Sequence, residues 1–383
     1  MSIAGLTAFS GVFALGVIFA IFGSIKLKLQ EQIKIDDAKA GSLISALMFS
    51  CLIFSMVIGA LTPLLGFKVV GLIGFAVGAV CVVLLAAAPS YGTAMLAFLA
   101  LGVAAMAVNT VGNTLGPMVL FPGNPAKANN LMNVFFGLGS LLTPLIIGNL
   151  IGKAGYKATL GVIAAMLAVP IVWTVMGTDF PVLEGGFSFG RAAGWLAHPA
   201  VLAAGAALFC YISLESRLGG FLTTYLTDHK VDATKANNYL AGFWCALMLA
   251  RLFTAFFVPQ AVFPYYVPVL ALVAAGSIMM MVTAKSAGSA VLAMLITGFV
   301  MGPIFPTLVG VTFGKTGVSA EVFGLIFAIG LLGGIITPRV MGGFSASGNI
   351  RKGMQVLAVL AVALIVLSGV LSLGIADLPP VAK

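Results

Sequence analysis

The sequence predicts an all-α membrane protein, with twelve transmembrane helices arranged as two parallel six-helix repeats around a central cavity. Its composition excludes a soluble domain, because 61% of the 383 residues are hydrophobic and 8% are charged, with a mean hydropathy of +1.18. Soluble domains carry about 25% charged residues. The apolar runs reach or approach the roughly 20 residues that a helix needs to cross a bilayer. In addition, two segments of the first half recur in the second half.

Breaks rich in charged residues, Pro or Asn divide the apolar runs into separate spans. We expect these spans to be helices, since a membrane β-barrel would show alternating segments of about 10 residues. In the first half they are expected at residues 6–25, 41–66, 69–89, 94–120, 130–152 and 157–177. In the second half they are expected at residues 198–225, 237–258, 265–284, 289–313, 321–345 and 354–376. The connections are short, which leaves no room for a soluble catalytic domain.

Internal repetition sets the organisation of the chain. The segment KIDDAKA at 34–40 recurs as KVDATKA at 230–236, an offset of 196 residues. GSLLTPLIIG at 139–148 recurs as GGIITPRVMG at 333–342, an offset of 194 residues. Each pair holds the same place in its half, either after the first span or within the fifth. Because six is an even number, the second copy enters the membrane in the same orientation as the first, which makes the repeats parallel.

This repeat divides the chain into three parts. We expect an N-terminal six-helix bundle at residues 1–177, a cytoplasmic linker at 178–197 and a C-terminal six-helix bundle at 198–383. Two bundles that face each other across a central cavity form the architecture of a rocking transporter.

Five segments match motifs of a known family. They are NTVGNTLGP in the fourth span, NNLMNVFFGLGSLLTPLIIG in the fifth, LESRLGGFLTTYL in the seventh, FWCALMLARL in the eighth and FAIGLLGGIITPRVMGG in the eleventh. On these segments the chain resembles the major facilitator superfamily, and within it the fucose permease type of sugar/proton symporters. The resemblance implies uptake of a solute by alternating access, with both termini in the cytoplasm.

The chain departs from the family pattern at acidic positions. Pro63 and Leu64 stand where the loop motif between the second and third spans has Asp and Arg. The fucose permease type carries a Glu four residues before an Asn in the fourth span, whereas here Asn109 precedes Asn113. The N-terminal half therefore contains no acid within a span.

One carboxylate lies within the predicted spans. Of the ten acidic residues, nine lie in loops or at span ends, which leaves Glu215. A charge at the bilayer centre costs at least about 2.5 kcal/mol, so such a residue normally faces a cavity or a partner. Arg217 lies on the opposite side of the helix, and Arg251 in the next span is the better partner. Arg217 and Arg339 lie nearer helix ends, where a structural, snorkelling role is expected.

Two roles remain open for Glu215 and Arg251. We expect Glu215 to face the central cavity, paired with Arg251 or with the solute, as a coupling-ion site, a solute contact or a gate. The alternative is a structural ion pair, or a hydrogen bond to a neighbouring helix, that locks the C-terminal half.

Uncharged polar and aromatic residues complete the candidate site. Asn109 and Asn113 are four residues apart and share one helix face, where amides suit the hydroxyl groups of a solute. The alternative is hydrogen bonding between helices. Tyr211, one turn before Glu215, and Trp244 are candidate contacts for a sugar ring, with simple packing as the alternative.

The fifth helix of each half carries a Gly and a Thr-Pro pair. Gly139 and Pro144 in the first half correspond to Gly333 and Pro338 in the second. Proline removes a helical hydrogen bond, and glycine permits close helix approach. We expect these four residues to be hinge and packing elements of alternating access.

The sequence gives no support for an enzyme. It has no Gly-rich phosphate loop, no His cluster, no metal-ligand spacing and no Ser/His/Asp set, and its Cys residues are widely separated. We expect no cofactor and no metal, apart from a coupling ion, which is either H⁺ or Na⁺.

The charge distribution conflicts with the orientation that the resemblance implies. The loops that would lie outside hold eleven basic residues, namely Lys26, Lys28, Lys34, Lys39, Lys153, Lys157, Lys230, Lys235, Lys285, Arg351 and Lys352. The cytoplasmic side would hold only Lys68, Lys127, Arg191, Lys315 and Lys383. This is the reverse of the positive-inside bias. We keep the superfamily orientation, in which a basic outer face and Arg251 favour anionic solutes.

The sequence therefore predicts a secondary active transporter that moves a small polar solute, with a sugar as the first candidate, by alternating access coupled to H⁺ or Na⁺. The alternative is a carrier or exporter of a small organic anion such as a sugar acid. A membrane receptor or scaffold that does not transport is disfavoured by the repeat and the hinge residues. We expect a monomer in a bacterial cytoplasmic (inner) membrane, with the lipid bilayer and a small-molecule solute as partners and no nucleic acid.

Overall fold

The structure is a computed structural model that describes residues 2–182, 189–346 and 350–374. All regular elements in these ranges are helical, and 10 helices are long and apolar enough to cross a membrane. Two of them, α2 (Asp37–Ala86) and α5 (Pro125–Met176), reverse direction at Gly66 and Gly155, where φ is 77° and 81°. Glycine adopts such angles without strain. Each of these two helices therefore crosses twice, and the predicted twelve transmembrane helices are confirmed.

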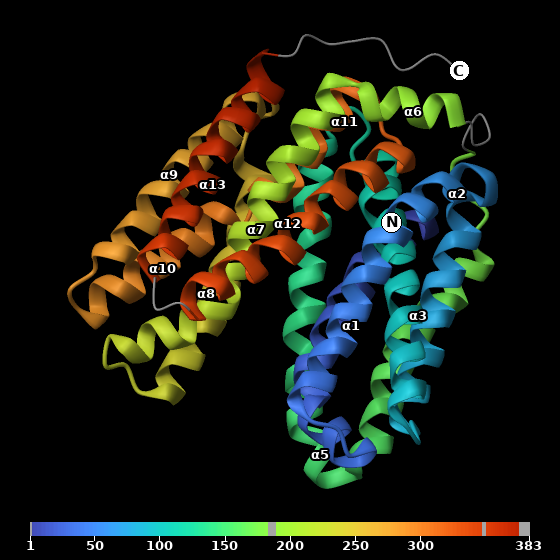
Figure 1. Ribbon diagram of the computed structural model, residues 1–383. Helices are drawn as coiled ribbons and strands as arrows, with labels where there is room; N and C mark the ends of the chain where they lie inside the picture. Colours follow the sequence, from blue (N-terminus) through green and yellow to red (C-terminus); the bar gives the residue numbers. More distant parts are fainter. Residues whose placement is uncertain (1, 183–188, 347–349, 375–383) are drawn as a thin grey trace.

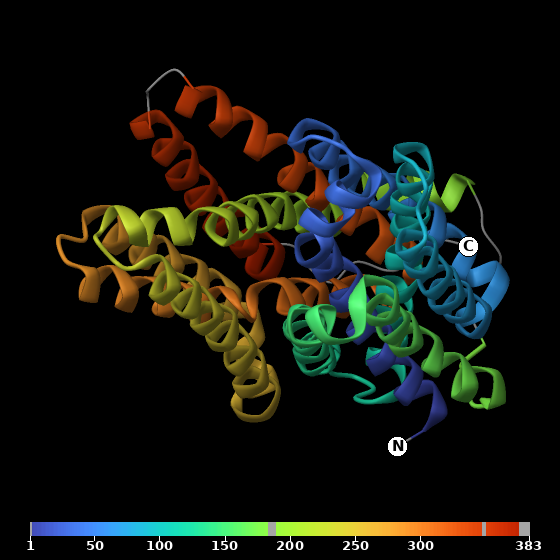
Figure 2. The ribbon, with the colours of Figure 1, turned by 90° about the horizontal axis from the view of Figure 1, so that it is seen from below.

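The chain forms two bundles side by side (Figures 1 and 2). The N-terminal bundle contains α1 (Ile3–Ile33), α2, α3 (Tyr91–Thr110), a π-helical turn (Val111–Leu115), α4 (Gly116–Val119) and α5. The C-terminal bundle contains α7 (Pro199–Asp228), α8 (Ala233–Phe257), a 3-10 turn (Gln260–Val262), α9 (Phe263–Thr283), α10 (Ala287–Met301), α11 (Ile304–Thr316), α12 (Ala320–Ala346), α13 (Ile350–Gly369) and a π-helical turn (Val370–Gly374). Between them, α6 (Phe189–Ala197) lies within the predicted linker.

Helix α1 is longer than the span predicted at residues 6–25. The prediction stopped where charged residues begin, but charges end an apolar run without ending a helix. Lys28 Nζ and Glu31 Oε2 pair at 2.8 Å on the extension, and pairs at this spacing favour helix. The helix stops only at Lys34, which adopts a left-handed conformation with φ of 52°.

The first sequence repeat encodes a helix-to-helix turn. Lys34 and Lys230 are the non-glycine residues with positive φ in the described chain, and each follows the first helix of its half. Two residues later, Asp36 and Asp232 accept a hydrogen bond from the backbone N–H three positions on, at 2.8 and 3.3 Å. A left-handed residue ends one helix, and an aspartate caps the next. The KIDDAKA and KVDATKA segments are thus explained by local structure.

The second repeat encodes a close helix contact. A Cβ on Gly139 would lie 2.2 Å from the carbonyl oxygen of Phe13, and one on Gly333 would lie 2.2 Å from that of Phe209. In both halves, therefore, the fifth helix packs its glycine against the backbone of the first helix. The two bundles are built in the same way.

The bundles touch on the side where the N-terminus and α6 lie, which we call the closed side (Figure 1). Ser55 Oγ of α2 donates to the carbonyl of Gly324 in α12 at 2.8 Å. Asn130 Nδ2 of α5 donates to Thr307 Oγ1 of α11 at 2.9 Å. The opposite side, where α1 joins α2 and where α5 bends at Gly155, is called the open side. Small and polar side chains thus let backbones of the two halves approach each other on the closed side.

Replacing Gly310 by Ala is expected to open the closed side. Its Cβ would lie 2.2 Å from Cα of Ala126 in the other half, so the helices must separate. Overpacking of this kind costs about 1–3 kcal/mol. The measurement is labelling by a thiol reagent of Ser55→Cys, introduced in a chain whose native cysteines are replaced. Ser55 is 1% exposed, so labelling should rise well above that of the parent.

Gly314→Ala is the matched control, one helical turn further along α11, because a Cβ there meets nothing within 4 Å. Equal labelling in the Gly310→Ala and Gly314→Ala chains would contradict the proposed contact.

Candidate functional site

A cavity of about 760 Å³ lies between the two bundles. Most of its wall is apolar, with several phenylalanines and Trp244. The polar side chains that line it are Ser45, Asn109, Asn133, Glu215, Ser216, Arg251 and Arg339. Ser45 lies near the start of α2 and Arg339 near the end of α12, so the cavity reaches toward the open side. A cavity of this size suits a small molecule.

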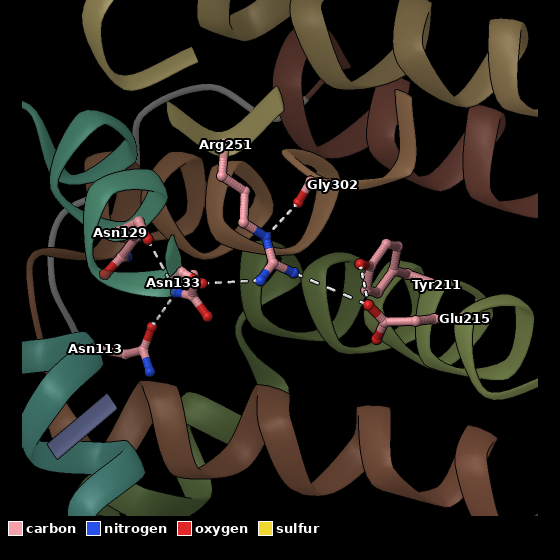
Figure 3. A network of polar contacts seen from close by, with 7 residues as sticks. All are labelled: Asn113, Asn129, Asn133, Tyr211, Glu215, Arg251 and Gly302. Carbon is pink, nitrogen blue, oxygen red and sulfur yellow. Dashed lines mark hydrogen bonds and ion pairs between the residues drawn. The ribbon is translucent and has the colours of Figure 1, made fainter. Parts of the chain in front are cut away.

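Arg251 of α8 stands at the wall of this cavity and bridges the two bundles (Figure 3). Its Nε donates to the carbonyl of Gly302 at 2.8 Å, and its Nη1 donates to the carbonyl of Asn133 in α5 at 3.1 Å. Its Nη2 lies 3.9 Å from Oε1 of Glu215. The side chain is only 3% exposed. A buried guanidinium therefore connects α8, the α10–α11 junction, α5 of the other bundle and α7.

The sequence explains why the carbonyl of Gly302 is available. Helix α10 ends at Met301 and α11 begins at Ile304, with Pro303 between them. Pro306 has no N–H, so it cannot donate to the carbonyl of Gly302 four residues earlier. A buried carbonyl needs another donor, and Arg251 supplies it.

Glu215 and Tyr211 lie one turn apart on α7. Tyr211 Oη donates to Oε1 of Glu215 at 2.7 Å, the same oxygen that faces Arg251. Glu215 is 26% exposed and lines the cavity, whereas Tyr211 is fully buried behind it. The structure thus brings together Glu215, Arg251 and Tyr211 in one cluster, with the carboxylate facing the cavity. Tyr211 does not itself line the cavity, in contrast to the contact expected for it, and it reaches the site through its hydrogen bond to Glu215.

A chain of amides lies on the N-terminal side. Asn113 Nδ2 donates to Asn109 Oδ1 at 2.8 Å, and Asn133 Nδ2 donates to Asn113 Oδ1 at 2.8 Å. Asn109 and Asn133 line the cavity, while Asn113 is fully buried and joins the fourth and fifth helices of the bundle. Sequence reasoning missed Asn133. Its spacing of four from Asn129 in the NNLMN segment was the available signal.

The remaining candidates are placed as follows. Trp244 lines the cavity, and its ring packs edge-on against Phe243, with centroids 5.2 Å apart. Helix α5 runs through Pro144 without leaving helical geometry there. The side chain of Pro338 lies outside the described residues, as does that of Arg217. The hinge role of Pro144 and Pro338 stays a prediction.

Arg339 also lines the cavity. The sequence places it near a helix end, where a structural, snorkelling role is expected, and that role stays a prediction. The structure puts it on the cavity lining, together with Leu331 and Ile335 of the same helix. These positions are four residues apart and share one helix face. Distance from a helix end does not tell which side of the helix a residue occupies.

Comparison with known families gives one match, to the Major Facilitator Superfamily over residues 7–338. The chain belongs to this superfamily. It is therefore an integral, multi-pass membrane protein of a transporter family. Comparison with curated proteins gives no match.

Solved structures of this superfamily share the fold. The chain is similar to the transporter FucP in the outward conformation, with a TM-score of 0.81 and 19% identity over 96% of this chain and 98% of that one. It is also similar to a variant of the E. coli fucose:proton symporter FucP, with a TM-score of 0.77 and 19% identity over 96% and 99% of the two chains. A third similar structure is the human organic anion transporter TETRAN, with a TM-score of 0.77 and 15% identity over 96% and 99%.

Glu215 and Arg251 are expected to be energetically coupled. Arg251→Met leaves the carboxylate without its cation, which should cost about 1–3 kcal/mol of stability. Combining it with Glu215→Gln should cost less than the sum of the two single losses. The measurement is a double-mutant cycle on thermal unfolding in detergent.

The control cycle is Lys28→Met with Glu31→Gln. This pair is shorter, at 2.8 Å, but its side chains are 54% and 72% exposed. Exposed pairs contribute about 0–1 kcal/mol. If the stability losses of the Glu215 and Arg251 variants were additive, or if the exposed pair showed the larger coupling energy, Glu215 and Arg251 would not be an interacting pair.

Proposed function

We propose that this protein moves a small polar solute across a bacterial cytoplasmic membrane by alternating access, coupled to H⁺ at Glu215. The observation that carries the proposal is the position of Glu215. It is the one carboxylate on the described cavity lining, and it faces the arginine that joins the two bundles.

The proton is expected to change the balance of forces on Arg251. At 3.9 Å the attraction between the ionised carboxylate and the guanidinium is about 4 kcal/mol for an effective dielectric constant of about 20. That attraction pulls Arg251 toward α7 and away from the carbonyl of Asn133. Protonation of Glu215 removes it and leaves Arg251 to its bridging hydrogen bonds. Because about 1.4 kcal/mol changes an equilibrium tenfold, one proton is enough to shift the two states.

H⁺ suits this site better than Na⁺. A sodium ion beside Glu215 would be repelled by the guanidinium, and the same carboxylate oxygen already accepts from Tyr211. A proton neutralises Glu215 without needing a cage of oxygen ligands.

A sugar-like solute is the first candidate. Asn109, Asn133 and Trp244 line the cavity, and they offer amides for hydroxyl groups and a ring face for a pyranose. The similarity to a fucose:proton symporter supports this class. An organic anion is the second candidate, because two arginines line the same cavity, and the similarity to an organic anion transporter supports it. In the superfamily orientation, both termini are cytoplasmic and the open side faces outward.

Glu215→Gln is expected to abolish proton-coupled accumulation while exchange of solute persists. Gln keeps the shape and the contact to Tyr211 but cannot bind and release a proton. The measurement uses proteoliposomes with an imposed pH gradient, radiolabelled neutral sugars and sugar acids, and an internal pH dye. Accumulation should fall at least about tenfold, the effect of losing about 1.4 kcal/mol of driving force, with solute counterflow retained.

Glu31→Gln, which changes an exposed acid outside the cavity, serves as the control. Solute-driven proton movement that survives Glu215→Gln would rule out Glu215 as the coupling group.

A further inference from the structure

The cavity carries a surplus of positive charge. Its described lining holds Arg251, Arg339 and Glu215, two cations against one anion. Arg251 is engaged by Gly302, Asn133 and Glu215. Arg339, in contrast, is exposed to the cavity and makes no hydrogen bond or ion pair with any described residue. The surplus charge therefore sits on Arg339.

An arginine within a membrane helix normally pairs with an acid or a carbonyl, or extends to the interface. Arg339 lies on the cavity face of α12, beyond Leu331 and Ile335 toward the open side. Its guanidinium presents a rigid fork of donors that matches a carboxylate. An unpaired fork at the wall of a solute cavity is a place for an anionic group that arrives from outside the protein.

The rest of the cavity wall is largely apolar and aromatic. Phe19, Phe49, Phe327 and Ile335 line it. Such a wall suits the carbon skeleton of a solute, while Asn109 and Asn133 suit its hydroxyl or carbonyl groups. The lining thus combines a cationic position toward the open side with apolar, aromatic and amide groups.

The open side supports the same conclusion. Its connections carry exposed lysines from both bundles, among them Lys39, Lys153, Lys235 and Lys285. Clustered charge of one sign raises the local concentration of oppositely charged solutes. Anions are therefore concentrated at the entrance that leads to Arg339.

We propose that the transported solute is a small organic monoanion, such as a sugar acid, whose carboxylate binds Arg339. This inference rests on the proposed function and specifies its substrate class. With Glu215 ionised, one negative charge offsets the surplus of the cavity, whereas a neutral sugar leaves it uncompensated. The anion and a proton on Glu215 together carry no net charge, so transport is electroneutral.

Binding of the anion and of the proton should reinforce each other. Among described residues, the groups facing Glu215 are Tyr211 on its own helix and Arg251 on α8, and Arg339 on α12 shares the cavity. Protonation of Glu215 removes the one negative charge of the lining and makes the cavity more attractive to an anion. By linkage, a bound anion favours the protonated form to the same degree.

The test is thermal stabilisation of the purified full chain by a panel of small monocarboxylates, each paired with its neutral amide or alcohol. Galacturonate with galactose is one such pair. A ligand of the folded protein raises its apparent Tm. At least one monocarboxylate should stabilise the protein, and its neutral counterpart should not. Arg339→Gln should weaken that ligand by about tenfold or more, the range for a lost hydrogen bond to a charged group, and Arg339→Lys should recover part of the loss.

Lys127→Gln is the control, because it removes a charge at the start of α5 on the closed side, away from the cavity lining and from the lysines of the entrance. It should leave affinity within about twofold, as expected for a screened surface charge. Stabilisation by the neutral member of a pair alone, by no monocarboxylate, or equally in Arg339→Gln would overturn the inference.

Flux in proteoliposomes separates this inference from the proposed function. Proton-coupled uptake of a neutral sugar would keep the proposed function and overturn the monoanion. Anion binding that depends on Arg339, without any proton movement, would support the monoanion and overturn coupling at Glu215.

Discussion

The buried guanidinium of Arg251 is the interaction on which the rest of the structure depends. A cation within the membrane must find acceptors or a counter-ion, and this one finds them on different helices. The break at Pro303 and Pro306 frees one carbonyl, and α5 of the other bundle supplies a second. Glu215 supplies the charge. The hydrogen bond to the carbonyl of Asn133 requires the two bundles to meet, so it links their contact to the cavity wall.

The two halves have the same backbone arrangement but contribute different polar groups to the cavity. Both have a left-handed lysine after the first helix and a glycine of the fifth helix packed on the first. The described charges on the cavity wall all come from the C-terminal bundle, while the N-terminal bundle contributes amides and the carbonyl of Asn133. The described charges of the cavity thus reside in one bundle, and the other provides a backbone acceptor for Arg251.

Much of the fold and part of the candidate site could be predicted from the sequence. Apolar runs and the two repeats predict twelve helices, and the scarcity of charges in the spans singles out Glu215 and Arg251. The predicted length of α1 was wrong because the hydropathy of the sequence falls at the membrane boundary, whereas the helix continues beyond it. Asn133 was missed, and the place of Arg339 on the cavity lining could not be predicted, because both depend on how α5 and α12 are rotated about their axes. That rotation is set by contacts such as those of Gly139 and Gly333, which pair distant parts of the chain.

The most direct test of the account is the distance between the two bundles on the open side. Lys39 and Lys235 are exposed and hold equivalent positions in the two repeats, so spin labels at Lys39→Cys and Lys235→Cys report this distance. The labels require a chain in which the native cysteines Cys51, Cys81, Cys210 and Cys245 are replaced. If Arg251 holds the bundles together through Asn133, then Arg251→Met should convert the long distance of the parent chain into a population with a shorter one. A distance distribution unchanged by Arg251→Met would show that the bridge does not control which side of the cavity is open.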